Sequence, residues 1–155
     1  MARRLELRRH APRDPDRDAL SPEGEALAER VGRILRGPYD AVFTSPKGRA
    51  ARTAAFFLKG LGQKLPERHG VAEGLSPPDG PIDAATASAL GAEVRRLLEA
   101  VPEGRTGLAV GHTPSLEEAV EALTGRRIPP LAECQGVLLR EEDGAVTVER
   151  ELRPD

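Results

Sequence analysis

The chain has 155 residues, of which 39% are hydrophobic and 31% charged, and its formal net charge at pH 7 is -2. This size and composition fit a folded globule, and we expect residues 1–155 to form a single domain. The nearly balanced charge argues against nucleic acid or an anionic membrane as a partner, and no stretch approaches the roughly 20 apolar residues of a membrane span.

The first part of the chain predicts a strand, a loop and a helix. Leucines alternate with charged residues over Arg3–Arg8, as in a strand with one buried face. Residues 11–19 are polar and contain two prolines, which favours a loop. Ser21 and Pro22 are typical of the cap and the first position of a helix, which we expect to end at Gly37-Pro38.

The next stretch predicts a second strand and a second helix. Residues 39–44 indicate a short strand, and Ser45 directly after it is expected to cap a helix that closes at Gly62. Residues 65–71 indicate a weak strand, and the proline-rich stretch 76–81 a rigid loop.

Two further elements follow that loop. Apolar residues at helical spacing predict a helix over 87–101, and residues 106–111 predict a clear strand. Ser115, with Glu118 three residues later, fits a capping box, and Gly125 is the expected end of that helix.

The C-terminal part predicts a β-hairpin. Strand-like runs at 137–140 and 146–152 flank Asp143-Gly144, a typical hairpin turn. Strands alternating with helices favour an α/β fold of three layers, α/β/α, around a mostly parallel central sheet, to which the hairpin adds an antiparallel edge. The only cysteine, Cys134, is expected to be a small buried thiol. Since no intrachain disulfide is possible, we expect a cytoplasmic protein.

Three polar segments directly follow predicted strands. His10, Ser45 and His112 each stand at the carboxyl end of such a strand. Right-handed crossovers place the carboxyl ends of parallel strands along one edge of a sheet, where open α/β sheets bind ligands. We therefore expect the three segments to share one rim.

Two arginines and two histidines of these segments predict phosphoryl chemistry. Guanidinium groups are permanently charged, bidentate donors that match the oxygens of a phosphoryl group. Neutral imidazole is nucleophilic near pH 7 and can carry that group covalently. The helix N-terminus expected near Ser115 favours an anion at the same place. The site needs neither a metal nor a cofactor, and its residues are Arg9, His10, Arg49 and His112.

Other charged and imidazole side chains have simpler interpretations. We expect Arg8, Arg13 and Arg52 to be solvated and His69 to have no functional role. A metal site is an alternative that we set aside, because two of its four candidate ligands lie in the proline-containing loop. Those ligands would be His10, Asp14, Asp16 and His112.

The motifs occur in the order of a known family. L-R-R-H, L-S-P-E-G-E-A, S-P-x-x-R-A-x-x-T-A and V-G-H-T-P-S-L follow one another, and the hairpin comes last. This order resembles the histidine phosphatase superfamily, also called phosphoglycerate mutase-like. The compactness of the chain is most similar to the short SixA-type phosphohistidine phosphatases. The resemblance implies a phosphoglycerate mutase-like fold and a phosphate pocket of Arg9, His10, Arg49 and His112, in which His10 becomes phosphorylated.

Two positions depart from the pattern of that family. Ala11 stands where the family has glycine, so this position must avoid strongly positive φ. Many members carry a carboxylic acid that protonates the leaving group, and here Glu73 is the best positional match and Asp79 the second. A phosphoramidate leaving group needs less protonation than an alkoxide, so a phosphohistidine phosphatase can lack this acid.

The sequence therefore predicts a phosphatase that works through phospho-His10. Its expected substrate is protein phosphohistidine, because the segment between Thr53 and His112 has little room for the long insertions that roof the pocket of mutases. Two alternatives stay open. One is a phosphomonoesterase for a small metabolite, such as a sugar phosphate or a nucleotide-pathway phosphate, and the other is a phosphate-binding regulatory module without turnover.

Overall fold

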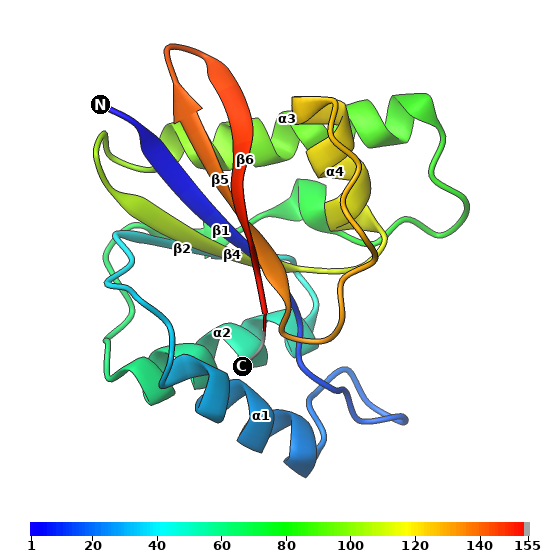
Figure 1. The fold of residues 1–155 in the computed structure, drawn as a ribbon. Helices are drawn as coiled ribbons and strands as arrows, with labels where there is room; N and C mark the ends of the chain where they lie inside the picture. Colours follow the sequence, from blue (N-terminus) through cyan, green and yellow to red (C-terminus); the bar gives the residue numbers. More distant parts are fainter. Residues whose placement is uncertain (154–155) are drawn as a thin grey trace.

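A six-stranded sheet runs through the molecule, in the strand order β3-β2-β4-β1-β5-β6 (Figure 1). The structure, a computed structural model, describes residues 1–153. Four strands are parallel, whereas β5 runs antiparallel to β1 and β6 antiparallel to β5. This arrangement confirms the predicted α/β fold with an antiparallel hairpin at its edge. The strands are β1 (Arg3–Arg9), β2 (Ala41–Thr44), β3 (His69–Val71), β4 (Thr106–Gly111), β5 (Gly136–Glu142) and β6 (Ala145–Leu152).

Helices cover both faces of the sheet (Figure 1). One face carries α1 (Pro22–Gly32) and α2 (Gly48–Leu61), and the other carries α3 (Ala84–Ala100) and α4 (Ser115–Thr124). An apolar core lies on each side, because side chains of successive strand residues point to opposite faces. Leu7 of β1 belongs to the core with α3 and α4, whereas Leu108 of β4 belongs to the core with α1 and α2. No helix within residues 1–153 is long and apolar enough to cross a membrane.

The first helix begins where the sequence predicts and ends earlier. Ser21 Oγ accepts a hydrogen bond of 3.0 Å from Gly24 N, which confirms the predicted cap. The helix ends at Gly32 rather than at Gly37-Pro38. The chain leaves the helix there and buries Leu35 in the core on this face.

The second helix is capped by a different residue from the predicted one. Its N-cap position is Lys47, without a side-chain cap bond, and the helix starts at Gly48. The free N–H groups of its first turn donate instead to Asp18, from Gly48 N at 2.6 Å and from Arg49 N at 3.1 Å. The prediction of Ser45 as the cap is wrong, because its hydroxyl is engaged elsewhere, as described below.

The capping box predicted at the start of α4 is also wrong. Ser115 is the first residue of the helix rather than its cap, and Pro114 occupies the cap position. Backbone bonds from Leu116 N to His112 O and from Glu118 N to Pro114 O close the first turn without side chains.

The predicted turns and ends are otherwise confirmed. Gly62 and Gly125 adopt φ of 78° and 74° directly after α2 and α4, the left-handed conformation that ends many helices. Asp143 and Gly144 both have positive φ, as a tight turn between β5 and β6 requires. The weak strand predicted over residues 65–71 is shorter than expected. β3 begins only at His69, and it pairs with β2 over three residues.

Candidate active site

The carboxyl ends of three parallel strands bring the predicted segments together. β4 lies between β2 and β1, and His10, Ser45 and His112 follow the last residues of β1, β2 and β4. The backbone N–H groups of His10 and Ser45 donate to Gly111 O and Val110 O, each over 3.1 Å. The expectation that these segments share one rim is therefore confirmed.

The two histidine rings lie next to each other at this rim, with their planes tilted by 59°. Their centroids are 5.2 Å apart, and both side chains are buried. His10 Nδ1 lies 2.7 Å from the carbonyl oxygen of Ala11, which can only accept a hydrogen bond. The neutral ring therefore carries its hydrogen on Nδ1 and has its lone pair on Nε2. A hydrogen bond of 2.6 Å between His112 Nε2 and Ser45 Oγ orients the second ring.

Arg9 and Arg49 reach the rim from β1 and α2. Arg9 Nη1 donates to Leu131 O over 3.0 Å, and Arg49 Nη1 donates to Asp18 Oδ1 over 2.9 Å. In both side chains Nε is buried and has no hydrogen-bond partner within residues 1–153. Burial of an unpaired donor destabilises a fold by about 1–3 kcal/mol. Two such donors, in arginines whose charges act on His10, are candidates for binding an anion.

Burial and positive charge keep both imidazoles neutral. Burial lowers the pKa of His10, and the charges of Arg49 and Arg9 lower it further. The backbone hydrogen bond with Ala11 and the charge of Glu133 act in the opposite direction. Burial, His10 and Arg49 lower the pKa of His112 to about 3. The lone pair of His10 is therefore free at neutral pH.

Sequence reasoning missed Asp18, which holds Arg49 in place. Its carboxylate accepts from the guanidinium of Arg49 and from two backbone N–H groups of α2. Burial acts in the opposite direction, but these hydrogen bonds lower the pKa of Asp18 to about 2, so it stays ionised. An aspartate among several charged residues of a loop leaves no pattern that could have identified it.

The candidate acids are exposed. Glu73 begins the short 3-10 helix η1 (Glu73–Leu75), which follows β3 at the same edge of the sheet, and Asp79 lies in the loop beyond it. The carboxylate whose charge acts on His10 is instead that of Glu133, in the loop before β5. The next residue, Cys134, has a positive φ of 65°, and its N–H donates to Arg9 O. Sequence reasoning missed Glu133, because nothing in its surroundings indicates that this loop returns to β1.

One interpretation of a flanking charge is wrong. Arg8 is not solvated as expected, because it is 4% exposed and forms an ion pair of 2.7 Å with Glu6, which also accepts a hydrogen bond from Tyr39. Alternation along β1 directs this side chain inward. Arg13 and Arg52 are exposed, as expected.

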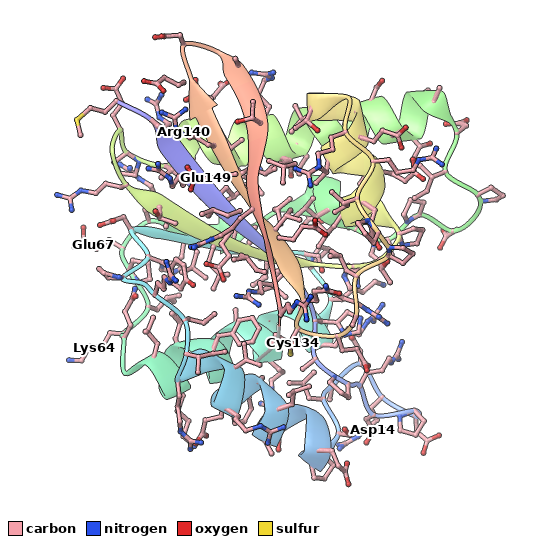
Figure 2. The ribbon with its side chains drawn as sticks, in the orientation of Figure 1. Asp14, Lys64, Glu67, Cys134, Arg140 and Glu149 are labelled. Atoms are coloured by element: carbon pink, nitrogen blue, oxygen red, sulfur yellow. The ribbon has the colours of Figure 1, made fainter. Side chains whose placement is uncertain are left out.

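The structure also describes three further single residues from the sequence analysis. Ala11 is buried and is not among the positive-φ residues of the described chain. Cys134 is buried just before β5 (Figure 2), and burial raises the pKa of its thiol to about 12. His69 is exposed.

The residues of the metal alternative are arranged differently from a ligand set. Asp14 Oδ1 accepts from the backbone N–H groups of Asp16 and Arg17, within the loop that follows β1 (Figure 2). Within residues 1–153, no three histidine, cysteine or carboxylate side chains come together as metal ligands do.

Known protein structures match nearly the whole chain. Phosphoglycerate mutase from Bacillus anthracis str. Sterne has a TM-score of 0.78 and 17% identity, over 99% of this chain and 93% of its own. The protein histidine phosphatase SixA in complex with tungstate has a TM-score of 0.76 and 19% identity, over 97% of each chain. A phosphoserine phosphatase mutant from Entamoeba histolytica, in complex with phosphoserine, has a TM-score of 0.76 and 19% identity, over 98% of each chain.

At these identities the likeness establishes the fold, which is phosphoglycerate mutase-like as predicted. A comparison with curated protein sequences finds no match. The family described as "Histidine phosphatase superfamily (branch 1)" matches residues 5–77, which include the first two of the three motif segments. This match covers a little under half of the chain and agrees with the family that the order of the motifs predicts.

Proposed function

We propose that the chain is a phosphatase that transfers the phosphoryl group of its substrate first to His10 and then to water. The observation that supports this most is the pairing of a neutral His10, with a free lone pair on Nε2, and two arginine Nε–H groups without partners. In this proposal, a phosphoryl group binds between them and engages all three.

In the first step, His10 Nε2 forms a bond to phosphorus while the bond from phosphorus to the leaving group breaks. The negative charge lies on the equatorial oxygens, where Arg9, Arg49, His112 and the N-terminus of α4 stabilise it. In the second step, water attacks phosphorus, the bond to Nε2 breaks, and phosphate leaves. Since the chain itself supplies this positive charge, the proposed reaction needs neither a metal nor a cofactor.

The preferred substrate in this proposal is phosphohistidine on a cytoplasmic protein. The chain between α2 and β4, all of it described, forms only β3, η1, α3 and their connecting loops, without a long insertion. In this proposal, the site is therefore open enough to admit the surface of a protein. The structural likeness to SixA supports the same substrate class.

A direct test compares the turnover of a protein that carries phosphohistidine with the turnover of free phosphohistidine. The intact mass of the protein, measured after mixing with phosphoramidate, should show one added phosphoryl group, which His10→Ala removes together with turnover. We expect turnover to survive EDTA and to stop with vanadate. Turnover by His10→Ala would contradict the mechanism, and a single phosphoryl transfer without turnover would identify a regulatory module.

A second candidate is a phosphatase for small phosphomonoesters. The similar structure that holds phosphoserine and the position of Glu73 at the same sheet edge favour it. Because an alkoxide leaving group needs a proton, Glu73→Gln should lower kcat heavily in this case. In the phosphohistidine case, the same variant should barely change the rate. A large loss with an alkyl phosphate, together with no activity on phosphohistidine proteins, would establish the second candidate.

A further inference from the structure

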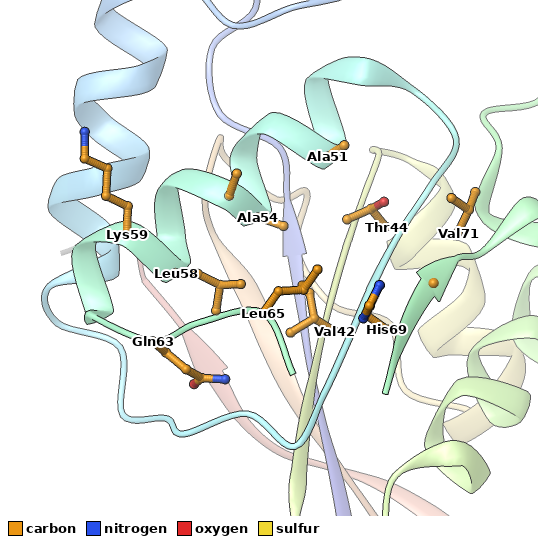
Figure 3. A pocket seen from close by; sticks show the side chains of 12 residues that line it. Val42, Thr44, Ala51, Ala54, Leu58, Lys59, Gln63, Leu65, His69 and Val71 are labelled. Atoms are coloured by element: carbon orange, nitrogen blue, oxygen red, sulfur yellow. The ribbon is translucent and has the colours of Figure 1, made fainter. Parts of the chain in front are cut away.

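An apolar groove lies beside α2, on the uncovered part of the sheet (Figure 3). Its volume is about 510 Å³, and side chains from β2, β3, α2 and the loop between α2 and β3 line it. Val42, Ala54 and Leu58 form much of its floor and wall. Leu65 and Val71 are 54% and 56% exposed at its margin. Large apolar side chains gathered at one exposed groove are typical of a binding surface.

The strand along this groove is at the edge of the sheet. β3 is the first strand in the sheet order and pairs only with β2 within the described chain. An edge strand offers backbone N–H and C=O groups to another extended segment. The groove therefore combines apolar side chains with a backbone that can pair with a ligand strand.

One end of the groove adjoins the candidate active site. Thr44 lines the groove, and the next residue, Ser45, bonds His112. Ala51 also lines it, and the backbone N–H of Ala51 donates to the carbonyl oxygen of Lys47, in the loop that follows Ser45. Val71, at the end of β3, pairs with Thr44 in the sheet. The groove thus ends at Thr44, one residue before the hydrogen-bond partner of His112.

We propose that the groove binds an extended apolar stretch of the phosphorylated protein whose phosphohistidine enters the site. The inference rests on the proposed function and adds how the substrate is selected. The continuity of groove and site favours this ligand, because a chain that carries the phosphorylated side chain must run past the rim. A small phosphorylated molecule fills only the site and leaves the groove empty.

Synthetic substrates test the proposal. The first is a short phosphohistidine peptide with alternating valine and leucine on both sides, the second has serine at the same positions, and the third is free phosphohistidine. The unaltered protein should have a KM for the apolar peptide about tenfold below that for the serine peptide, as the loss of one or two apolar contacts would give. Leu65→Lys and Val71→Lys should abolish this difference and change kcat/KM for free phosphohistidine less than about twofold.

Ile34→Lys is the matched control, because Ile34 is 53% exposed and lies outside the groove. It should leave all three substrates unaffected. Equal KM for the two peptides would overturn the inference, and so would equal losses on all three substrates in the groove variants. A change from dimer to monomer on Leu65→Lys, with no change in KM, would show that a second copy fills the groove instead. If free phosphohistidine itself is not hydrolysed, the proposed function fails first.

Discussion

Arg8 and Arg9 are neighbours on β1, and their surroundings differ. Arg8 is buried, and its guanidinium donates hydrogen bonds to Glu6, to Cys134 O and to Arg153 O. Arg9, one residue on, donates to Leu131 O and has a buried Nε without a partner in the described chain. Both arginines lie on the same strand, so their different hydrogen bonding separates a structural side chain from a candidate ligand-binding one.

The difference extends to the groups around each arginine. Glu6 accepts from Arg8 and from Tyr39 Oη at 2.8 Å, so the buried cluster of Glu6, Arg8 and Tyr39 is complete without a ligand. At the rim, burial and the charges of Arg49 and Arg9 lower the pKa of His10. Each of these arginines has a buried Nε without a hydrogen-bond partner in the described chain. Buried polar groups are nearly always hydrogen-bonded in folded proteins, so unsatisfied ones at a sheet edge indicate where a ligand binds.

The largest expected effect concerns the residues at the rim, where Arg9 and Arg49 each have a buried Nε without a partner in the described chain. Arg49→Lys should reduce kcat/KM by about 10²–10⁴, because an ammonium cannot hold Asp18 and a phosphoryl oxygen as the planar guanidinium does. Steady-state kinetics on phosphohistidine measure this loss. The matched control is Arg52→Lys on the same helix, where an exposed arginine pairs with Glu25 over 3.0 Å and should be replaceable without loss. Equal effects of the two variants would remove the distinction between the arginines.

Substitutions in the buried cluster of Glu6, Arg8 and Tyr39 should lower the free energy of unfolding and leave the activity unchanged. Glu6→Ala leaves the guanidinium of Arg8 buried without its carboxylate, which should lower the free energy of unfolding by about 3–5 kcal/mol. Tyr39→Phe removes one hydrogen bond to a charged group, for an expected loss of about 1.5–3 kcal/mol. Denaturant unfolding measures both. Preserved stability of Glu6→Ala, or a kinetic defect without a loss of stability, would contradict this interpretation of the cluster.

The sequence predicted the part of the molecule that follows from local pattern. Strand alternation, the Ser21 cap and the glycines after α2 and α4 are local signals, and the carboxyl edge follows from parallel topology. The inward orientation of Arg8 was missed, because its partners Cys134 and Arg153 are distant in the sequence. For the same reason Asp18 could not be identified as the cap of α2, nor Ser45 as the partner of His112. Whether a polar residue caps a helix or serves a site depends on tertiary contacts.

Acid should destabilise the fold, because the folded chain keeps the pKa of His112 low. The unfolded chain takes up a proton on His112 as the pH falls below about 6.5, whereas the folded chain, with a pKa of about 3, does not. The unfolding free energy should therefore fall by about 2–3 kcal/mol between pH 6.5 and 4.5 because of His112 alone. The depressed pKa of Asp18, about 2, acts only at lower pH. His112→Asn should flatten the profile, and His69→Asn, at an exposed position, should not; a flat profile in the unaltered protein would contradict the low pKa.

The smallest expected effect concerns Glu133. Its negative charge raises the pKa of His10 against burial and the two arginines, so Glu133→Gln should lower that pKa further. Phosphorylation of His10 needs the neutral ring, and its rate falls as the pH drops through this pKa. The acid limb of the rate profile should move to lower pH, with little change in the plateau near pH 7. Rapid mixing with phosphoramidate at a series of pH values measures the limb, and Glu67→Gln, in the exposed loop that precedes β3 (Figure 2), is the control. A limb that moves to higher pH would show that Glu133 does not act on His10 by its charge. The loop that holds Cys134 at positive φ would then contribute only to the buried cluster around Arg8.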